Sequence, residues 1–109
     1  MPSYTRQFAH LTGILPSRLG DETLLAGAVI AAAGAVGLTP HGTPIARSSP
    51  RGLALGLLGH GGHIVLHAEP DAGGCLVDVV VPAPGSAERA VEVIARRLGA
   101  QITPLAHPA

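Results

Sequence analysis

The sequence predicts an α+β fold, a two-layer α/β sandwich in which an antiparallel sheet carries two helices on one face. Two capped apolar segments, 21–37 and 86–98, have the length and apolar spacing of helices. Between them lie several apolar segments joined by glycine-rich turns of the hairpin kind, which favours antiparallel pairing. The predicted order is strand, helix, consecutive strands, helix, strand, within a single domain that spans residues 1–109.

The first half of the chain contributes one strand and one helix. Residues 8–15 alternate in the manner of a strand, and Pro16 and Gly20 then break the pattern. Asp21 is a good N-cap, the apolar residues that follow it recur at helical spacing, and Gly37 ends the helix after Val36. Residues 38–47 contain two prolines, which allow only an edge strand or a loop.

The second half supplies the remaining strands and the second helix. The predicted strands are residues 52–58, 63–67, 75–81 and 101–105. The turn 59–62 makes the first two of these a hairpin, and residues 72–74 make another turn. Ser86 caps the helix over residues 87–98.

Composition favours self-association and argues against two classes of partner. Hydrophobic residues make up 47% of the chain but aromatic residues only 2%, so each core side chain buries little area. We therefore expect a homodimer, which would bury more. The formal net charge is zero and no basic run occurs, which argues against nucleic acid and against an anionic membrane.

Location is predicted from the cysteine count and from the apolar segments. Cys75 is the single cysteine, which excludes an internal disulfide and suits a reducing cytoplasm. The first seven residues contain no apolar signal segment, and the apolar segment 24–38 is short for a membrane span. We expect a cytoplasmic protein.

One ungapped region carries a specific resemblance. It contains Pro50-Arg51-Gly52, His63 and His67 four residues apart, Pro70-Asp71, and Val77-Asp78. This layout resembles the bacterial S-adenosylmethionine decarboxylases, in which Pro-x-Gly is followed by Ser-His, a second His, Pro-Glu, and Val-Asp before a Cys. The resemblance covers roughly residues 10–100 and implies that family's two-layer sandwich and its dimeric habit.

The resemblance also shows which reacting groups are missing. Gly62 stands where the family has the self-cleaving Ser that becomes the pyruvoyl group, and Pro82 stands at the Cys proton donor. Ala54 replaces a Ser that assists processing, and Ser48 replaces an aromatic residue that stacks on adenine. Glycine has no oxygen to start the acyl shift, so we expect no pyruvoyl cofactor and no adenosylmethionine decarboxylation by that route.

The remaining polar residues define the candidate site. We assign acid–base roles to His67, His63 and Asp71, because imidazole titrates near neutral pH and Asp71 matches a family Glu at a ribose hydroxyl. The residues assigned to substrate binding are His10, His60, Ser48 and Asp78. Two alternatives stay open: His67 is instead a buried histidine bonded to backbone, and Asp78 is instead a structural anchor.

A metal site is considered and not favoured. Residues 60–67 hold three histidines, but on a strand His63 and His67 lie too far apart for one ion. A further ligand from His10 or Asp71 would be needed, and no Cys pair supports such a site. We therefore assign no metal ligand.

Three functions follow from these observations. The first is a repurposed, pyruvoyl-independent enzyme, of lyase or isomerase type, that acts on a small molecule in bacterial specialised metabolism. The second is a non-catalytic paralogue that serves as a binding or activating subunit, since every reacting group is lost. The third is the histidine-based metal site.

Overall fold

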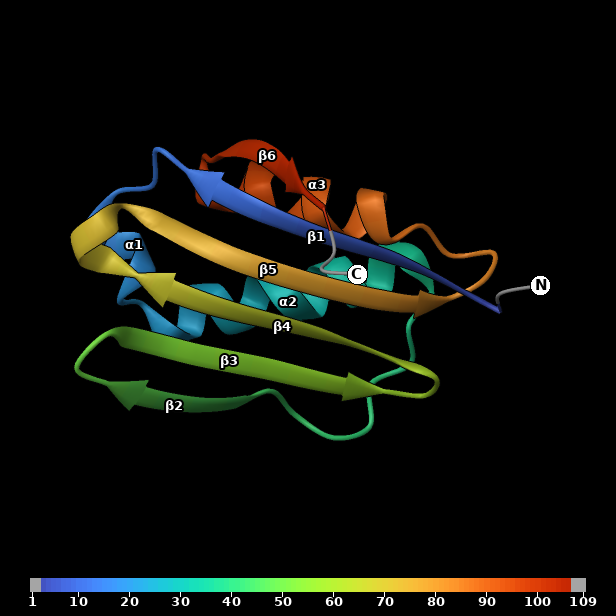
Figure 1. Ribbon diagram of the computed structural model, residues 1–109. Helices are drawn as coiled ribbons and strands as arrows, with labels where there is room; N and C mark the ends of the chain where they lie inside the picture. The colour runs from blue at the N-terminus through green and yellow to red at the C-terminus, as the bar shows by residue number, and fades with distance from the viewer. Residues whose placement is uncertain (1–2, 107–109) are drawn as a thin grey trace.

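Six antiparallel strands form one sheet in the computed structural model, which describes residues 3–106 (Figure 1). The strand order across the sheet is β2-β3-β4-β5-β1-β6, so the first strand lies between the fifth and the last. The elements are β1 (Tyr4–Thr12), α1 (Pro16–Leu19), α2 (Glu22–Val36), β2 (Ile45–Ser49), β3 (Gly52–Gly59), β4 (Gly62–Glu69), η1 (Pro70–Ala72), β5 (Gly74–Pro82), α3 (Ala87–Leu98) and β6 (Gln101–Leu105).

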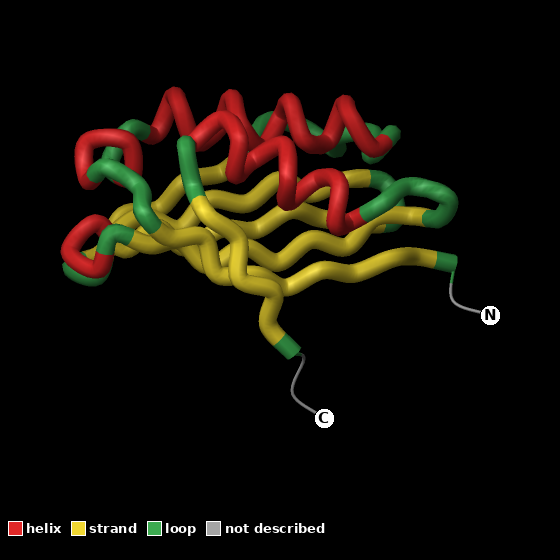
Figure 2. The backbone as a smooth tube through the Cα atoms, turned by 90° about the horizontal axis from the view of Figure 1, so that it is seen from above, coloured by secondary structure: helices red, strands yellow, loops and turns green. Residues whose placement is uncertain are grey.

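The two long helices, α2 and α3, cover one face of the sheet and leave the other face open (Figure 2). The Asp21 side chain accepts a hydrogen bond from the Leu24 amide at 3.0 Å, and Ser86 accepts one from the Arg89 amide at 3.1 Å. Both caps satisfy amides that the first helical turn leaves unpaired. The predicted helix boundaries and the predicted α+β sandwich are confirmed. No helix within residues 3–106 is long and apolar enough to cross a membrane.

Small and branched side chains fill the space between the helices and the sheet. Alternation along β4 sends Ile64, Leu66 and Ala68 into this core, and α3 adds Ile94 and Leu98. Within residues 3–106 no polar or charged residue is buried, and no aromatic residue is among the buried ones. Such a core removes little apolar area from water per residue, as the composition predicts.

The prediction is wrong at the first strand. β1 spans Tyr4–Thr12 instead of residues 8–15, because it pairs with β5 along its whole length, from Tyr4 opposite Pro82 to Thr12 opposite Gly74. Gly13 then turns the chain with a φ of 74°, a conformation that glycine adopts without steric cost.

Two further boundaries differ. Residues 16–19, predicted as a break, form the short helix α1, since proline is tolerated in a first helical turn. The edge strand β2 begins after Pro44 and extends to Ser49, beyond the predicted segment 38–47. Pro40 contributes only an isolated bridge to Gly59.

Candidate functional site

The open face of the sheet carries most of the polar residues that the sequence singles out. Alternation along β4 and β5 sends their neighbouring apolar side chains into the core and turns His63, His67 and Asp78 to the open face. His10 of β1 faces the same side, because it lies opposite Leu76 in the register that also pairs Leu76 with His67. The structure therefore brings four of the seven predicted site residues onto one surface.

Asp78 is held by two partners from the neighbouring strands. Arg6 of β1 donates to it through Nε at 3.1 Å and Nη2 at 3.4 Å, and Nε2 of His63 lies 3.2 Å from Oδ2. The three side chains are 44%, 26% and 35% exposed for Arg6, Asp78 and His63. Water screens pairs of this exposure, so each contributes only about 1 kcal/mol or less to stability. The network orients side chains more than it stabilises the fold.

The ionisation of Asp78 decides which nitrogen of His63 is available. Partial burial favours the neutral acid, but the hydrogen bonds and charges of Arg6 and His63 outweigh it and lower the pKa of Asp78. An ionised Asp78 only accepts hydrogen bonds, so Nε2 of His63 carries the proton between them. In the tautomer that donates through Nε2, Nδ1 is the acceptor. A carboxylate that orients an imidazole in this way is a recurrent arrangement for general-base chemistry.

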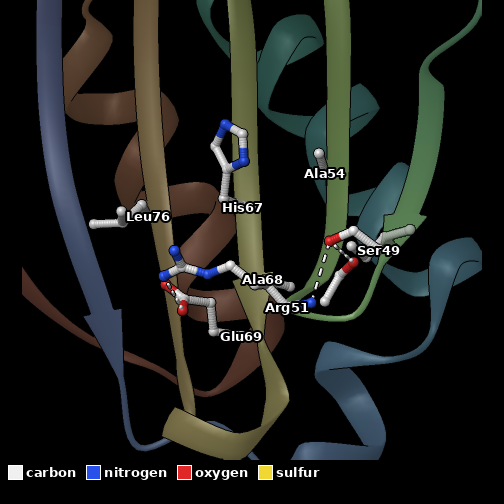
Figure 3. A pocket seen from close by; sticks show the side chains of 9 residues that line it. Ser49, Arg51, Ala54, His67, Ala68, Glu69 and Leu76 are labelled. Atoms are coloured by element: carbon white, nitrogen blue, oxygen red, sulfur yellow. Dashed lines mark hydrogen bonds and ion pairs between the residues drawn. The ribbon is translucent and has the colours of Figure 1, made fainter.

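His67 lies between two cavities on the open face. One, of about 400 Å³, is lined by Arg6, Phe8, Val65, His67, Leu76 and Asp78. The other, of about 390 Å³, lies toward the β2 edge, where Ala54 stands directly opposite His67 (Figure 3). The His67 side chain is exposed, so the alternative of a buried core histidine does not hold. An exposed imidazole bordering a cavity is free to meet a ligand.

The second cavity has charged walls. Nη2 of Arg51 pairs with Oε2 of Glu69 at 3.2 Å, and the Arg51 amide donates to Oγ of Ser49 at 3.2 Å (Figure 3). The Arg51 side chain is 84% exposed, so this pair is easily exchanged for contacts with a ligand. The cavity thus presents a cation and an anion side by side.

Three predicted site residues do not join this surface. Ser48 lies opposite Leu53, which packs against the core, so its side chain faces the helix side of the β2 edge. Asp71 is exposed in η1, past the end of β4. His60 lies in the turn between β3 and β4 and contacts His41, a residue that the sequence did not single out. Their predicted positions in one pocket depended on strand direction and turn geometry, which the sequence pattern did not specify.

No three-ligand metal site is assembled in the part of the chain that the structure describes. Within residues 3–106, no group of three or more His, Cys, Asp or Glu residues could hold an ion. Nε2 of His63 instead contacts Oδ2 of Asp78, and His67 lies four residues further along β4.

Arg6 is the contributor that the sequence analysis missed. Placing the first strand at residues 8–15 excluded it, although it shares the period-two alternation of Phe8 and His10. Extending that alternation backwards would have placed Arg6 on the open face. Its pairing with Asp78 still depends on the β1–β5 register.

Comparison with known proteins decides the family. The sequence model of the S-adenosylmethionine decarboxylase family matches residues 6–107. The chain belongs to this family. A solved structure described as the adenosylmethionine decarboxylase from Aquifex aeolicus VF5 superposes with a TM-score of 0.81 at 21% identity, covering 95% of this chain and 88% of that one. At this identity the superposition supports the fold alone. None of the curated proteins matches.

The backbone around Gly62 leaves little space for a side chain. A Cβ at Gly62 would lie 2.2 Å from the carbonyl oxygen of Val80 on β5, closer than real Cβ atoms approach. Pro82 ends β5 nearby, since a Cβ on Gly61 would lie 3.1 Å from its ring. Residues 62 and 82, which the sequence resemblance matches to the family's Ser and Cys, thus lie at one end of the sheet, and residue 62 has no room for a side chain without movement of β5. The backbone itself is arranged for glycine.

Proposed function

We propose that this chain is a pyruvoyl-independent member of the S-adenosylmethionine decarboxylase family that performs acid–base chemistry on a small polar molecule. His67 and the His63–Asp78 pair supply the groups that exchange protons. The reaction is of lyase or isomerase type. In an isomerisation one group removes a proton from carbon and another delivers a proton to a different carbon; in an elimination the second group instead protonates the leaving group as its bond to carbon breaks.

One observation carries this proposal. Asp78 orients His63 at 3.2 Å and also lines, together with His67, the cavity of about 400 Å³ on the open face. Arg6 lines the same cavity and offers a cation for an anionic group of the ligand. Asp71 contributes less to the proposal, because it lies exposed in η1 beyond the strand that carries the histidines.

Deuterium incorporation tests the proposal with pools of candidate substrates in place of one chosen compound. Protein is incubated with pools of small polar metabolites in D₂O, and mass spectrometry detects molecules that gain deuterium at carbon. We expect the wild-type protein to incorporate deuterium. His67→Asn should lose this activity while its melting temperature stays that of the wild type. The control His41→Asn, assayed in the same metal-free buffer, should keep the activity. No incorporation from any pool, or equal incorporation by His67→Asn, would refute the acid–base assignment.

The proposal includes a single uncleaved chain without a pyruvoyl group. Self-cleavage needs a hydroxyl or thiol at residue 62, and glycine has neither. Intact-mass measurement should give about 10.9 kDa for the purified protein, and carbonyl reagents should not label it. Two fragments that meet near residue 62 would contradict both points.

We propose that a second copy covers the open face. Three of the most exposed large hydrophobic residues, Tyr4 at 52%, Ile45 at 54% and Leu58 at 61%, lie on this face according to the strand register. The face also carries both Arg6 and Asp78, so that a two-fold related copy can match its charges. Such a dimer would enclose the cavities.

Light scattering tests the dimer. Leu58→Glu should yield monomers, while Ile30→Glu, which adds the same charge to the outer face of α2, should leave the dimer intact. A monomeric wild-type protein at high micromolar concentration, or equal effects of the two substitutions, would exclude this interface. We also propose a cytoplasmic location, because Cys75 is a free, buried thiol.

A second candidate function is that of a non-catalytic partner subunit. The lack of room for any side chain at Gly62 favours it, because it makes the loss of the reacting group complete. This candidate predicts that the chain co-elutes with an intact decarboxylase of the family and raises its turnover. Absence of a mixed complex, together with deuterium incorporation by the chain alone, would favour the enzyme.

A further inference from the structure

Two histidines outside the open-face site lie in contact. His41 comes from the connection between α2 and β2, and His60 from the turn between β3 and β4. Their ring centroids are 5.2 Å apart with an angle of 62° between the ring planes, and both residues are exposed. The sequence separates them by 19 positions, so only the fold brings them together.

The backbone fixes both histidines. The His41 amide donates to the Leu58 carbonyl at 2.7 Å, and the His60 amide donates to the Thr39 carbonyl at 2.9 Å. The bridge between Pro40 and Gly59 lies between these two bonds. The two imidazoles therefore extend from backbone segments that are hydrogen-bonded to each other. This lowers the entropy lost when a common ligand orders both rings.

The separation of the rings matches that of two ligands on one metal ion. Zn–N bonds of about 2.0–2.1 Å, with each nitrogen about 1.1 Å from its ring centroid, place two centroids about 5 Å apart at a tetrahedral angle. The observed 5.2 Å agrees with this value. Imidazole is also the side chain that suits zinc, copper and nickel. We propose that His41 and His60 bind one divalent transition-metal ion, with water completing its coordination.

A bound ion would join two segments next to Gly62, the position that the resemblance matches to the family's cleavage site. His60 lies two residues before Gly62, and residues 38–41 run along the same hairpin. The ion would therefore crosslink the α2–β2 connection to the β3–β4 turn and stabilise the folded state by mass action. Metal ligation needs an unprotonated ring nitrogen, so binding should weaken as the pH falls.

An edge-to-face contact between two rings would also explain their proximity, and titration separates the two explanations. Zn²⁺ alone is titrated calorimetrically into the full chain, prepared without a histidine tag. We expect one ion per chain, at least tenfold weaker binding by His41→Ala and by His60→Ala, and binding within twofold of wild type by His10→Ala. A chain that ends at Ala106 removes His107 from the comparison and should bind as wild type does.

Cu²⁺ provides a second readout that does not depend on affinity. Its unpaired electron broadens NMR signals of nearby rings, and we expect loss of the His41 and His60 ring signals first. Zinc should raise the melting temperature of the wild-type protein but not that of His41→Ala. No zinc binding by the wild-type chain, undiminished binding by His41→Ala, or first broadening at His63 or His67 would overturn the proposal.

Discussion

Replacing Gly62 by serine restores the residue type of the decarboxylase family and should fail to restore its chemistry. The new Cβ would lie 2.2 Å from the Val80 carbonyl oxygen and 3.0 Å from its carbon. An ordinary carbon–oxygen contact is about 3.3 Å, so β4 and β5 must separate by about 1 Å at this point. This movement strains the neighbouring pair, His63 opposite Val80.

The expected loss in unfolding free energy follows from overpacking against the backbone, because a backbone carbonyl cannot rotate away as a side chain can. Overpacking costs about 1–3 kcal/mol, and a clash with a carbonyl lies toward the upper end. For a domain of this size, about 2–3 kcal/mol lowers the melting temperature by roughly 10–20 °C. Intact mass should still show one chain, because a strained strand start does not position the hydroxyl for attack.

Gly56→Ser is the matched control for this experiment. It makes the same substitution on the same hairpin, but its Cβ would meet only a methyl group of Val65, at 3.8 Å. We expect a change in melting temperature of a few degrees at most. If Gly62→Ser and Gly56→Ser have the same melting temperature, or if the Gly62→Ser chain is cleaved before residue 62, the steric argument is refuted.

Three further predictions concern single side chains. Burial raises the pKa of Cys75 to about 12, and a backbone hydrogen bond with His67 opposes this only in part. Iodoacetamide at about pH 8 should therefore label Cys75 only after unfolding. Rapid labelling of the folded protein would contradict this. Because the pKa of Asp78 is lowered on folding, its stabilisation is present above the unfolded pKa of about 3.9 and is lost as the pH falls through the folded value. The difference in unfolding free energy between wild type and Asp78→Asn should therefore shrink below about pH 4, and a difference that stays unchanged as the pH falls to about 2 would argue against the Arg6–Asp78–His63 network. Oγ1 of Thr5 donates to the Gly85 carbonyl at 2.8 Å and accepts from the Ala87 amide at 2.9 Å, so Thr5→Val should cost about 1–2 kcal/mol in urea unfolding. Thr12→Val, on the same strand, should cost less, and equal costs would argue against the two hydrogen bonds.

The helices were predictable because their signals are local. Asp21 and Ser86 each cap a helix through an amide three residues ahead, and Gly37 and Gly99 end the helices in the left-handed conformation. These features need no information from the rest of the chain. The start of β1 has no such signal, because its polar first residues are held in the strand by β5, where Tyr4 pairs with Pro82 and Arg6 with Val80, far away in sequence.

The candidate site was predictable only as a set of residues on a face. Period-two alternation places His63 with His67 once the strand is known. The contact between His63 and Asp78 depends in addition on the β4–β5 register, and the contact with Arg6 depends on the β1–β5 register. His41 and His60 meet through the path of a loop, for which the sequence offers no periodic signal.

The close packing around Gly62 extends to its neighbours. A Cβ on Gly59 would lie 2.5 Å from the side chain of Leu38, and a Cβ on Gly62 would lie 3.2 Å from it. Leu38 is itself buried, and the residues that follow it are bonded to the hairpin backbone. The two glycines and Leu38 therefore pack closely against one another, so a side chain at residue 59 or 62 would have to displace Leu38. The small polar ligand proposed above would meet the open face, where His67 is exposed and His63 and Asp78 are partly exposed. The proton chemistry proposed above needs only those groups, so it does not depend on a side chain at residue 62.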